Sequence, residues 1–242
     1  MNPIELNLFS SRLESICEQM GEVLRNAAFS PNIRDRLDFS CAIFDSSGEL
    51  SAQAAHIPVH LGSMAFAMSS VVESVSWSEG DQVIFNNPFL GGTHLPDVTM
   101  VAPVFISGML TAFIVNRAHH ADIGADTPGS MPVSSSLEQE GVVISPQHYY
   151  QSGQANQALL KKLEVKLTGD DTSGDFAAQL SANRFGVEAL SDLILSMSRQ
   201  HYIDGLDALN NYASMLARQS LEKIPDGIYE FEDLMDDDGQ DK

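Results

Sequence analysis

The chain has 242 residues, 43% of them hydrophobic, so it is long enough to bury a substantial core and is not expected to be disordered. Its formal net charge of −20 argues against nucleic acid and anionic membranes as partners, because both attract clustered Lys and Arg. The two cysteines, Cys17 and Cys41, have no CxxC spacing, and the N-terminus lacks the pattern of a secretory signal. We therefore expect a reducing, cytoplasmic location.

The first 60 residues predict a helix followed by two short strands. Apolar residues recur at spacings of three and four from Ile4 to about Ala28, which is typical of an amphipathic helix. Alternating apolar residues from Phe39 to Ile43 predict a half-buried strand, and Ser46-Ser47-Gly48 predicts a turn into a second strand over Glu49–Gln53. Asp38, at the entry of the first strand, is by its position alone more typical of a cap than of a ligand.

Two histidines precede the next predicted helix. His56 and His60 are four residues apart, a spacing that can bind a metal on a helix, but Pro58 between them favours a loop. Direct ligation is therefore the less favoured interpretation, and an orienting or substrate-facing role stays open. A helix over Ser63–Val75 and a strand over Val83–Phe85 follow.

The central stretch, residues 86–131, contains two clusters of polar residues on either side of an apolar segment. His94 and Asp97 precede this segment, and His119, His120 and Asp122 follow it. The segment, Val101–Val115, is interrupted by Ser107-Gly108 and is too short for a membrane span, which needs about 20 apolar residues. It predicts a buried β-hairpin whose two strands bring the polar clusters together at one end.

This pattern predicts a divalent-metal site. Imidazole and carboxylate ligands together suit Zn, Mn or Fe, and an open position on the ion would hold water. Neighbouring residues of a strand point to opposite faces, so only one of His119 and His120 should face the metal, and the other is left for proton transfer or a supporting hydrogen bond. The alternative is that these histidines are ordinary polar residues at strand ends.

The C-terminal third is predicted to be helical. A β-rich run, Val142-Val143-Ile144, is followed by helices over Ala155–Leu163, from Thr172 through Met197, and from Ile203 to before Pro225. The predicted fold class is therefore α+β. We expect a mixed α/β region with the metal site over residues 1–150, a helical region over 151–225, and the start of a β-rich region over 226–242.

Six motifs carry a resemblance to a known family. They are RLDFSCAIFD, HIPVHLGSM, NNPFLGGTHLPDVTMVAPVF, NRAHHADIGADTPGSMP, EQEGVVISP and GDFAAQLSANRFG. In this order and spacing they resemble the hydantoinase B/oxoprolinase family, over residues 32–239. The family includes the B subunit of N-methylhydantoinase, part of 5-oxoprolinase, and subunits of acetone and acetophenone carboxylases.

The resemblance implies a metal-containing subunit of an ATP-dependent cyclic-amide hydrolase. A hydantoinase A-type partner would bind ATP and activate the amide, which a metal-bound hydroxide would then attack, in a hetero-oligomer. By the same resemblance, the metal ligands are Asp38, His94, Asp97 and His119, with His120 and Asp122 beside them as catalytic residues. Only the resemblance makes Asp38 a ligand.

The length and the shared motifs leave two alternatives. Family members are about twice as long and continue into a β-rich second half, so this chain resembles their N-terminal half only. One alternative is a subunit of an ATP-dependent ketone carboxylase, which would use the same metal residues to form a carbon–carbon bond. The other is a scaffold subunit or inactive fragment without catalysis.

Overall fold

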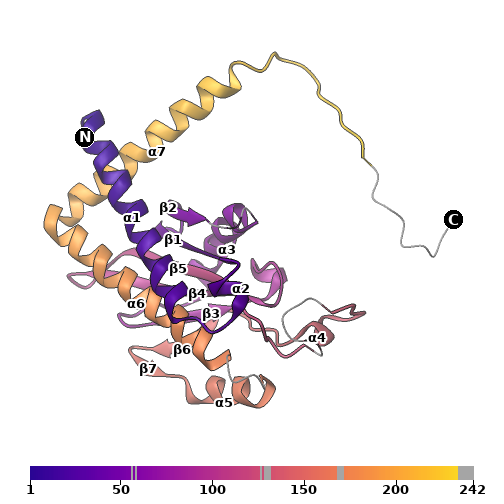
Figure 1. Ribbon diagram of the computed structural model, residues 1–242. Coiled ribbons are helices and arrows are strands. Elements are labelled where there is room, and N and C mark those ends of the chain that lie inside the picture. Colours follow the sequence, from indigo (N-terminus) through magenta and orange to yellow (C-terminus); the bar gives the residue numbers. More distant parts are fainter. Residues whose placement is uncertain (56, 58, 126, 128–131, 168–171, 234–242) are drawn as a thin grey trace.

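The computed structural model describes residues 1–55, 57, 59–125, 127, 132–167 and 172–233. These residues form one seven-stranded antiparallel sheet with helices on both faces, as Figure 1 shows, so the predicted α+β class is confirmed. The strand order is β2-β1-β5-β4-β3-β6-β7. The bounds are β1 Phe39–Asp45, β2 Leu50–Ala55, β3 Gln82–Phe85, β4 Asp97–Ile106, β5 Met109–His119, β6 Gln147–Gln151 and β7 Gln154–Ala155.

The predicted hairpin lies at the centre of the sheet and is confirmed. Strands β4 and β5 pair from Ile106↔Met109 at the turn to Asp97↔His119 at the open end. Ser107 and Gly108 both have positive φ, 52° and 76°, which matches the right-handed twist of a two-residue hairpin turn. The two predicted polar clusters therefore begin at the same end of the hairpin.

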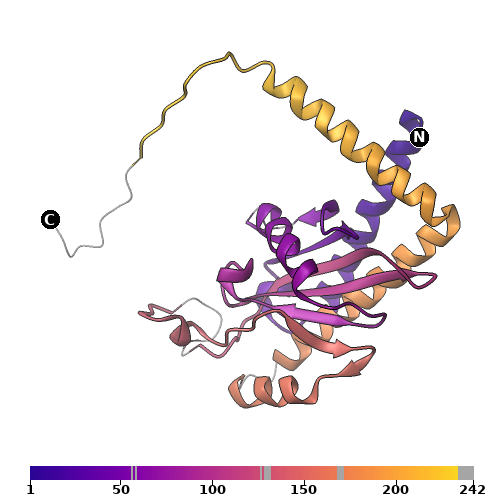
Figure 2. The same ribbon diagram turned by 180° about the vertical axis from the view of Figure 1, so that it is seen from behind.

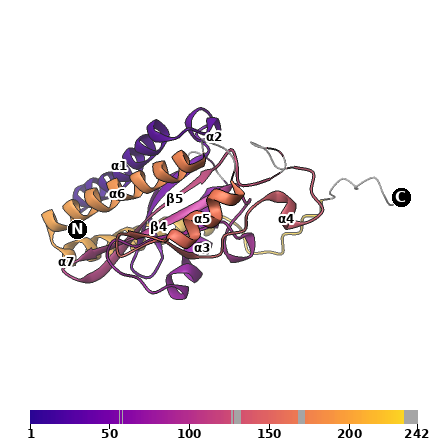
Figure 3. The ribbon, with the colours of Figure 1, turned by 90° about the horizontal axis from the view of Figure 1, so that it is seen from below.

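Two long helices and the start of a third cover one face of the sheet. They are α1 (Pro3–Ala27), α6 (Thr172–Met197) and α7 (Arg199–Leu221). Figure 3 shows α1 and α6 side by side along this face. The apolar stripe of α1 is buried there, as the spacing of its residues predicts. Its buried members are Phe9, Leu13, Ile16, Cys17, Met20, Gly21 and Leu24.

The other face is covered by α3 (His60–Ser74), which buries Met64, Ala67, Met68 and Val71 against the sheet. Because helices lie on both faces, six consecutive residues of β1 are buried. The prediction of a half-buried β1 is therefore wrong. The larger apolar side chains of β1 alternate with smaller ones such as that of Ala42, but the smaller side chains are buried as well.

A further apolar cluster lies between the N-terminal part of α6, the helix α5 (Gln157–Lys166) and the β3–β6 side of the sheet. Val142 and Ile144 are buried in it, but residues 141–145 form no strand. The side chain of Asn86 bonds to the Val142 carbonyl and the Ile144 amide, at 2.8 and 2.7 Å, in place of a neighbouring strand. The predicted β-rich run is thus an extended segment, and the strand β6 begins later, at Gln147.

Three short helical segments complete the described elements: α2 (Pro31–Arg34), the 3-10 turn η1 (Pro88–Leu90) and α4 (Leu137–Glu140). Helix α7 runs away from the sheet, as Figures 1 and 2 show. Residues 222–233 form neither helix nor strand, so a β-rich region beginning at residue 226 stays a prediction, as does the division at 150 and 225. In the described part of the chain, no helix combines the length and apolar character that crossing a bilayer requires.

Candidate metal centre

The candidate centre lies at the open end of the central hairpin. Asp97 is the first residue of β4 and His119 the last residue of β5, and the two are direct partners across the strands. Strand β5 pairs with β4 along one edge and with β1 along the other, and Asp38 immediately precedes β1. The Asp38 carbonyl accepts a hydrogen bond from the His119 amide at 3.0 Å. Three neighbouring strands therefore bring these residues together.

Asp97 is the centre of the cluster. Its Oδ1 lies 2.7 Å from His119 Nδ1, and its Oδ2 lies 3.0 Å from His94 Nδ1. The Thr93 hydroxyl also donates to Oδ2. Asp38 Oδ2 lies 3.8 Å from the same Nδ1 of His119. One buried carboxylate thus orients both imidazoles that the sequence predicts as ligands.

The loop before β4 carries His94 to this position. Gly91 has φ 94°, and a Cβ there would collide with Ala67 of α3, so the loop packs tightly on that helix. The buried side chain of Arg117 donates to the Gly91 carbonyl at 2.9 Å, to Thr99 Oγ1 at 2.8 Å and to Ser63 Oγ at 2.7 Å. This guanidinium ties the loop, β4 and the start of α3 to β5.

His60, the first residue of α3, completes the lining of the centre. Its side chain is fully buried, and Nδ1 lies 3.0 Å from the Ser40 hydroxyl. Its Nε2 has no hydrogen-bond partner among the described residues. A ring nitrogen of His60 lies within 4.8 Å of carboxylate oxygens of Asp38 and Asp97. The sequence left its role open because Pro58 obscured the helix that begins at residue 60, while His56 lies outside the described residues.

Burial and mutual contact shift the pKa values in the cluster. Burial alone would raise the pKa of Asp97, but hydrogen bonds from His119, His94 and Thr93 hold it well below its usual range. The contact with Asp97 raises the pKa of His94. Burial lowers the pKa of His60 to about 4 and raises that of Asp38. The cluster therefore favours an ionised Asp97 and a neutral His60, which are the forms that bind a metal.

His120 and Asp122 are placed differently from the four predicted ligands. His120 is buried on the opposite face of the sheet, where Nε2 lies 2.9 Å from Gln179 Oε1 and the ring packs on Phe176. Asp122 accepts a hydrogen bond from the Gly124 amide at 2.7 Å. Of the described residues, those in groups that could hold an ion are Asp38, His60, His94, Asp97 and His119, so neither His120 nor Asp122 joins them.

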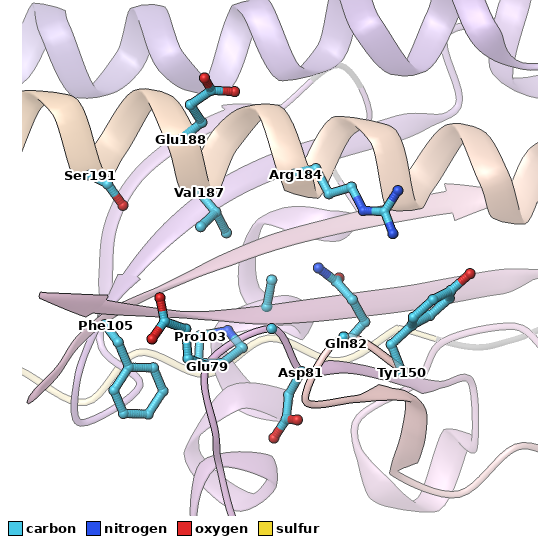
Figure 4. A pocket seen from close by; sticks show the side chains of 13 residues that line it. Glu79, Asp81, Gln82, Pro103, Phe105, Tyr150, Arg184, Val187, Glu188 and Ser191 are labelled. Atoms are coloured by element: carbon cyan, nitrogen blue, oxygen red, sulfur yellow. The ribbon is translucent and has the colours of Figure 1, made fainter. Parts of the chain in front are cut away.

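A separate cavity of about 280 Å³ lies between α6 and the β3–β4 side of the sheet (Figure 4). Its lining includes Gln82, Tyr150 and Arg184, with the guanidinium 5.6 Å from the centre of the Tyr150 ring. None of the five residues of the candidate centre lines it. The chemistry of the His/Asp cluster is therefore not located in this cavity.

The model of the hydantoinase B/oxoprolinase family matches residues 2–241. The chain belongs to this family. It is similar to 5-oxoprolinase of Dictyostelium discoideum, with 39% identity over 234 residues that cover 95% of this chain and 18% of that protein. The resemblance drawn from the six motifs is therefore confirmed.

Two solved structures have the same fold. The ATP-dependent caprolactamase from Pseudomonas jessenii matches with a TM-score of 0.86 and 28% identity, over 94% of this chain and 40% of that one. Nucleotide-free acetone carboxylase matches with a TM-score of 0.79 over 85% of this chain and 28% of that one, but at 18% identity the likeness shows the fold alone. The chain thus spans less than half the length of each of these three proteins.

The donor set fits the divalent metal that the family implies. Two imidazoles and two carboxylates converge within hydrogen-bonding or ion-pairing distances, which is a mixed N/O set of the kind that binds Zn, Mn or Fe. The unpartnered, buried Nε2 of His60 beside them is a further sign, because buried polar atoms normally have a partner. Arg117 and Gln179 were not singled out from the sequence, although an arginine within an apolar strand is an unusual residue to bury.

Proposed function

We propose that the chain is the metal-holding part of a B-type subunit in an ATP-dependent cyclic-amide hydrolase. The observation that carries the proposal is the contact of one buried carboxylate, Asp97, with both His94 and His119, beside Asp38. Membership of the hydantoinase B/oxoprolinase family and the likeness to caprolactamase support the reaction class. ATP would be bound by a partner of the hydantoinase A type.

The proposed ligands are Asp38, His94, Asp97 and His119. When bound, a divalent ion supplies a Lewis acid that lowers the pKa of water and polarises a carbonyl group. Asp97 would hold the two imidazoles in one orientation, and the Thr93 hydroxyl would hold Asp97. Arg117, bonded to the Gly91 carbonyl, would keep the His94 loop against α3.

His120 and Asp122 receive different roles in this proposal. Since His120 is hydrogen-bonded to Gln179 and its ring packs on Phe176, it would stabilise the hairpin from the other face of the sheet and would not exchange protons with substrate. Asp122 lies three residues after His119, where it accepts a hydrogen bond from the Gly124 amide, and it stays a candidate for contact with substrate. If Asp122 contacts substrate, Asp122→Asn should lose turnover and retain the metal. If Asp122 is a ligand, the variant should lose the metal.

Sequence identity favours a hydrolase over a ketone carboxylase. Acetone carboxylase shares the fold at 18% identity, whereas 5-oxoprolinase of Dictyostelium discoideum is 39% identical. Cyclic amides such as hydantoins, 5-oxoproline and lactams are thus the proposed substrate class. Turnover of ATP that requires bicarbonate and a ketone would instead establish the carboxylase.

The decisive experiment measures bound metal in the purified protein by elemental analysis. We expect one divalent ion per chain in the wild type and a loss of most of it in His94→Ala and His119→Ala. His201→Ala is the matched control, because His201 lies exposed on α7 and should leave the metal content unchanged. Retention of metal by both cluster variants would refute the proposed centre.

A second measurement addresses the reaction. With the ATP-binding partner present, we expect ATP hydrolysis to be coupled to opening of a cyclic amide and to require Asp97. A metal-loaded wild-type protein that supports no ATP-dependent turnover with its partner would leave the metal centre standing and would contradict the assignment as a hydrolase. It would favour a scaffold role.

A further inference from the structure

One stripe of α6 is polar although it faces the buried side of the sheet. Asp175, Gln179 and Asn183 follow one another at intervals of four, so they lie on the same side of the helix. All three are buried, with at most 1% of their surface exposed. The motif GDFAAQLSANRFG contains all three residues, and the proposed metal chemistry uses none of them.

The Gln179 side chain makes three hydrogen bonds to the central hairpin. Its amide nitrogen donates to the Val98 carbonyl and to Asn116 Oδ1, both at 2.8 Å, and its oxygen lies 2.9 Å from His120 Nε2. Because the amide nitrogen is the donor to both oxygens, the oxygen is the acceptor towards His120, which must carry its hydrogen on Nε2. The contact therefore defines the tautomer of His120.

Two of the three partners of Gln179, Val98 and His120, are next to the proposed ligands. Val98 directly follows Asp97 in β4, and His120 directly follows His119 after the end of β5. One carboxamide thus bridges the two strands at the pair Asp97↔His119, where the ladder of the hairpin ends. Beyond this pair, the His120 amide still bonds to the Pro96 carbonyl at 2.9 Å. From α6, the Gln179 side chain thus contacts both strands at this point.

The next polar residue of the stripe makes a similar set of bonds one helical turn further on. Asn183 donates to the Met100 carbonyl at 3.1 Å and to Gln82 Oε1 at 3.0 Å, and it accepts from Asn116 at 2.7 Å. Gln82 lines the cavity of Figure 4, as Arg184 does. None of the partners of Asn183 is adjacent to a proposed ligand, so Asn183 is similar to Gln179 in burial and bonding but not in position.

We propose that Gln179 is a positioning residue for the metal centre. Through the Val98 carbonyl and the His120 ring, it fixes the spacing and orientation of Asp97 and His119 from the reverse face of the sheet. This inference rests on the proposed function, because it assigns Gln179 to the same centre. Side chains that support metal ligands through hydrogen bonds typically change metal affinity by about 10–100-fold when removed.

The test compares Gln179→Met with Asn183→Leu. Each substitution removes three buried hydrogen bonds and nearly preserves volume, so both should lower the melting temperature. Zn²⁺ affinity is measured by chelator competition well below the melting temperature, and the absorption spectrum of the Co²⁺-loaded protein reports ligand geometry. We expect Gln179→Met to bind Zn²⁺ at least about tenfold more weakly and to alter the Co²⁺ spectrum. Asn183→Leu should resemble the wild type in both.

Equal Zn²⁺ affinities and Co²⁺ spectra in the two variants would overturn the positioning role and leave Gln179 as a structural residue. If Gln179→Met does not fold, Gln179→Asn replaces it, because the shorter amide keeps its polarity but cannot reach both strands. The same direction of change is expected. A wild-type protein that binds neither ion would refute the proposed function as well, whereas a wild type that binds and a Gln179 variant that binds equally well would refute this inference alone.

Discussion

Arg117 is a buried cation whose hydrogen-bond partners are neutral oxygens. Within the described part of the chain it makes no ion pair, and burial lowers its pKa to about 10. The three acceptors belong to the His94 loop, to β4 and to α3, so the guanidinium joins segments that the hairpin alone does not hold. Its charge also lies near enough to Asp97 to favour the ionised carboxylate.

Replacing Arg117 should therefore destabilise the protein strongly. Arg117→Met leaves three acceptors without their donor, and we expect a loss of about 3 kcal/mol in the free energy of unfolding, measured by urea denaturation. Arg184→Met is the matched control: its guanidinium is exposed over Tyr150, and the loss should be under about 1 kcal/mol. Similar losses in the two variants would contradict the anchoring role of Arg117.

His60 should make the metal-free protein sensitive to acid. Burial lowers its pKa to about 4, against 6.5 for an ordinary histidine. As the pH falls below 6.5, the unfolded chain takes up a proton that the folded protein refuses until about pH 4, so stability decreases over this window. The shift corresponds to about 3 kcal/mol.

The measurement is urea denaturation between pH 7 and pH 4 in the presence of a chelator. His60→Gln should lose less stability over this range than the wild type, because glutamine does not titrate. His201→Gln, which changes an exposed histidine, should follow the wild-type curve. Parallel curves for wild type and His60→Gln would show that His60 is not the group responsible.

At the scale of elements, a glycine in the turn of the hairpin and a glycine near the start of α3 have different backbone conformations. Gly108 has φ 76°, whereas Gly62 lies within the helix α3, and a Cβ added at either residue would meet no atom within 4 Å. Any effect of alanine at these positions therefore comes from the backbone and not from packing. The two residues isolate the conformational preference of glycine.

We expect Gly108→Ala to destabilise the protein by about 1 kcal/mol, because the left-handed region disfavours a Cβ. Gly62→Ala should instead stabilise it by about 0.5–1 kcal/mol, because alanine is the better helix former. Both are measured as shifts of the urea midpoint. Since the turn lies at the opposite end of the hairpin from Asp97, Gly108→Ala should not alter Zn²⁺ affinity. The same sign of change in both variants would contradict the assigned backbone conformations.

At the scale of the whole molecule, the sequence was sufficient to predict individual helices and strands, but not which distant elements contact one another. The apolar run interrupted by Ser107-Gly108 was sufficient to predict the hairpin and the meeting of Asp97 with His119, because a two-residue turn determines the pairing register. Asp38 joins them through β1, a neighbour in the sheet, and strand order is not encoded in local periodicity. For this reason Asp38 entered the prediction through the family resemblance only.

The contributions of His60 and Gln179 could not be predicted because each depends on packing between distant elements. His60 reaches the centre only because α3 lies across the sheet, and Gln179 only because α6 lies across the other face. In the sequence, Gln179 is indistinguishable from an ordinary polar residue of a helix. Double-sided coverage of the sheet also explains why alternation in β1 was wrongly interpreted as exposure.

The second half of α7 extends from the body of the molecule. Tyr202 and Leu206 are buried near its start, whereas every described residue from 210 to 233 is exposed. This exposed segment contains many apolar side chains, namely Tyr212, Met215, Leu216, Leu221, Ile224, Ile228, Tyr229 and Phe231. Apolar surface of this extent usually marks an interaction surface or promotes self-association.

A chain that ends at Asn210 should therefore fold with nearly unchanged stability, because the buried contacts of α7 are retained. We expect the free energy of unfolding to change by under about 1 kcal/mol and Zn²⁺ affinity to stay at the wild-type value. Binding of a hydrophobic dye and self-association on size-exclusion chromatography should both decrease, since the exposed apolar side chains are removed. Tyr202→Ala, which removes a buried ring that packs on Phe9, provides the contrast and should cost about 3 kcal/mol or more. A truncated chain as unstable as Tyr202→Ala would contradict this expectation and mean that the removed segment stabilises the body.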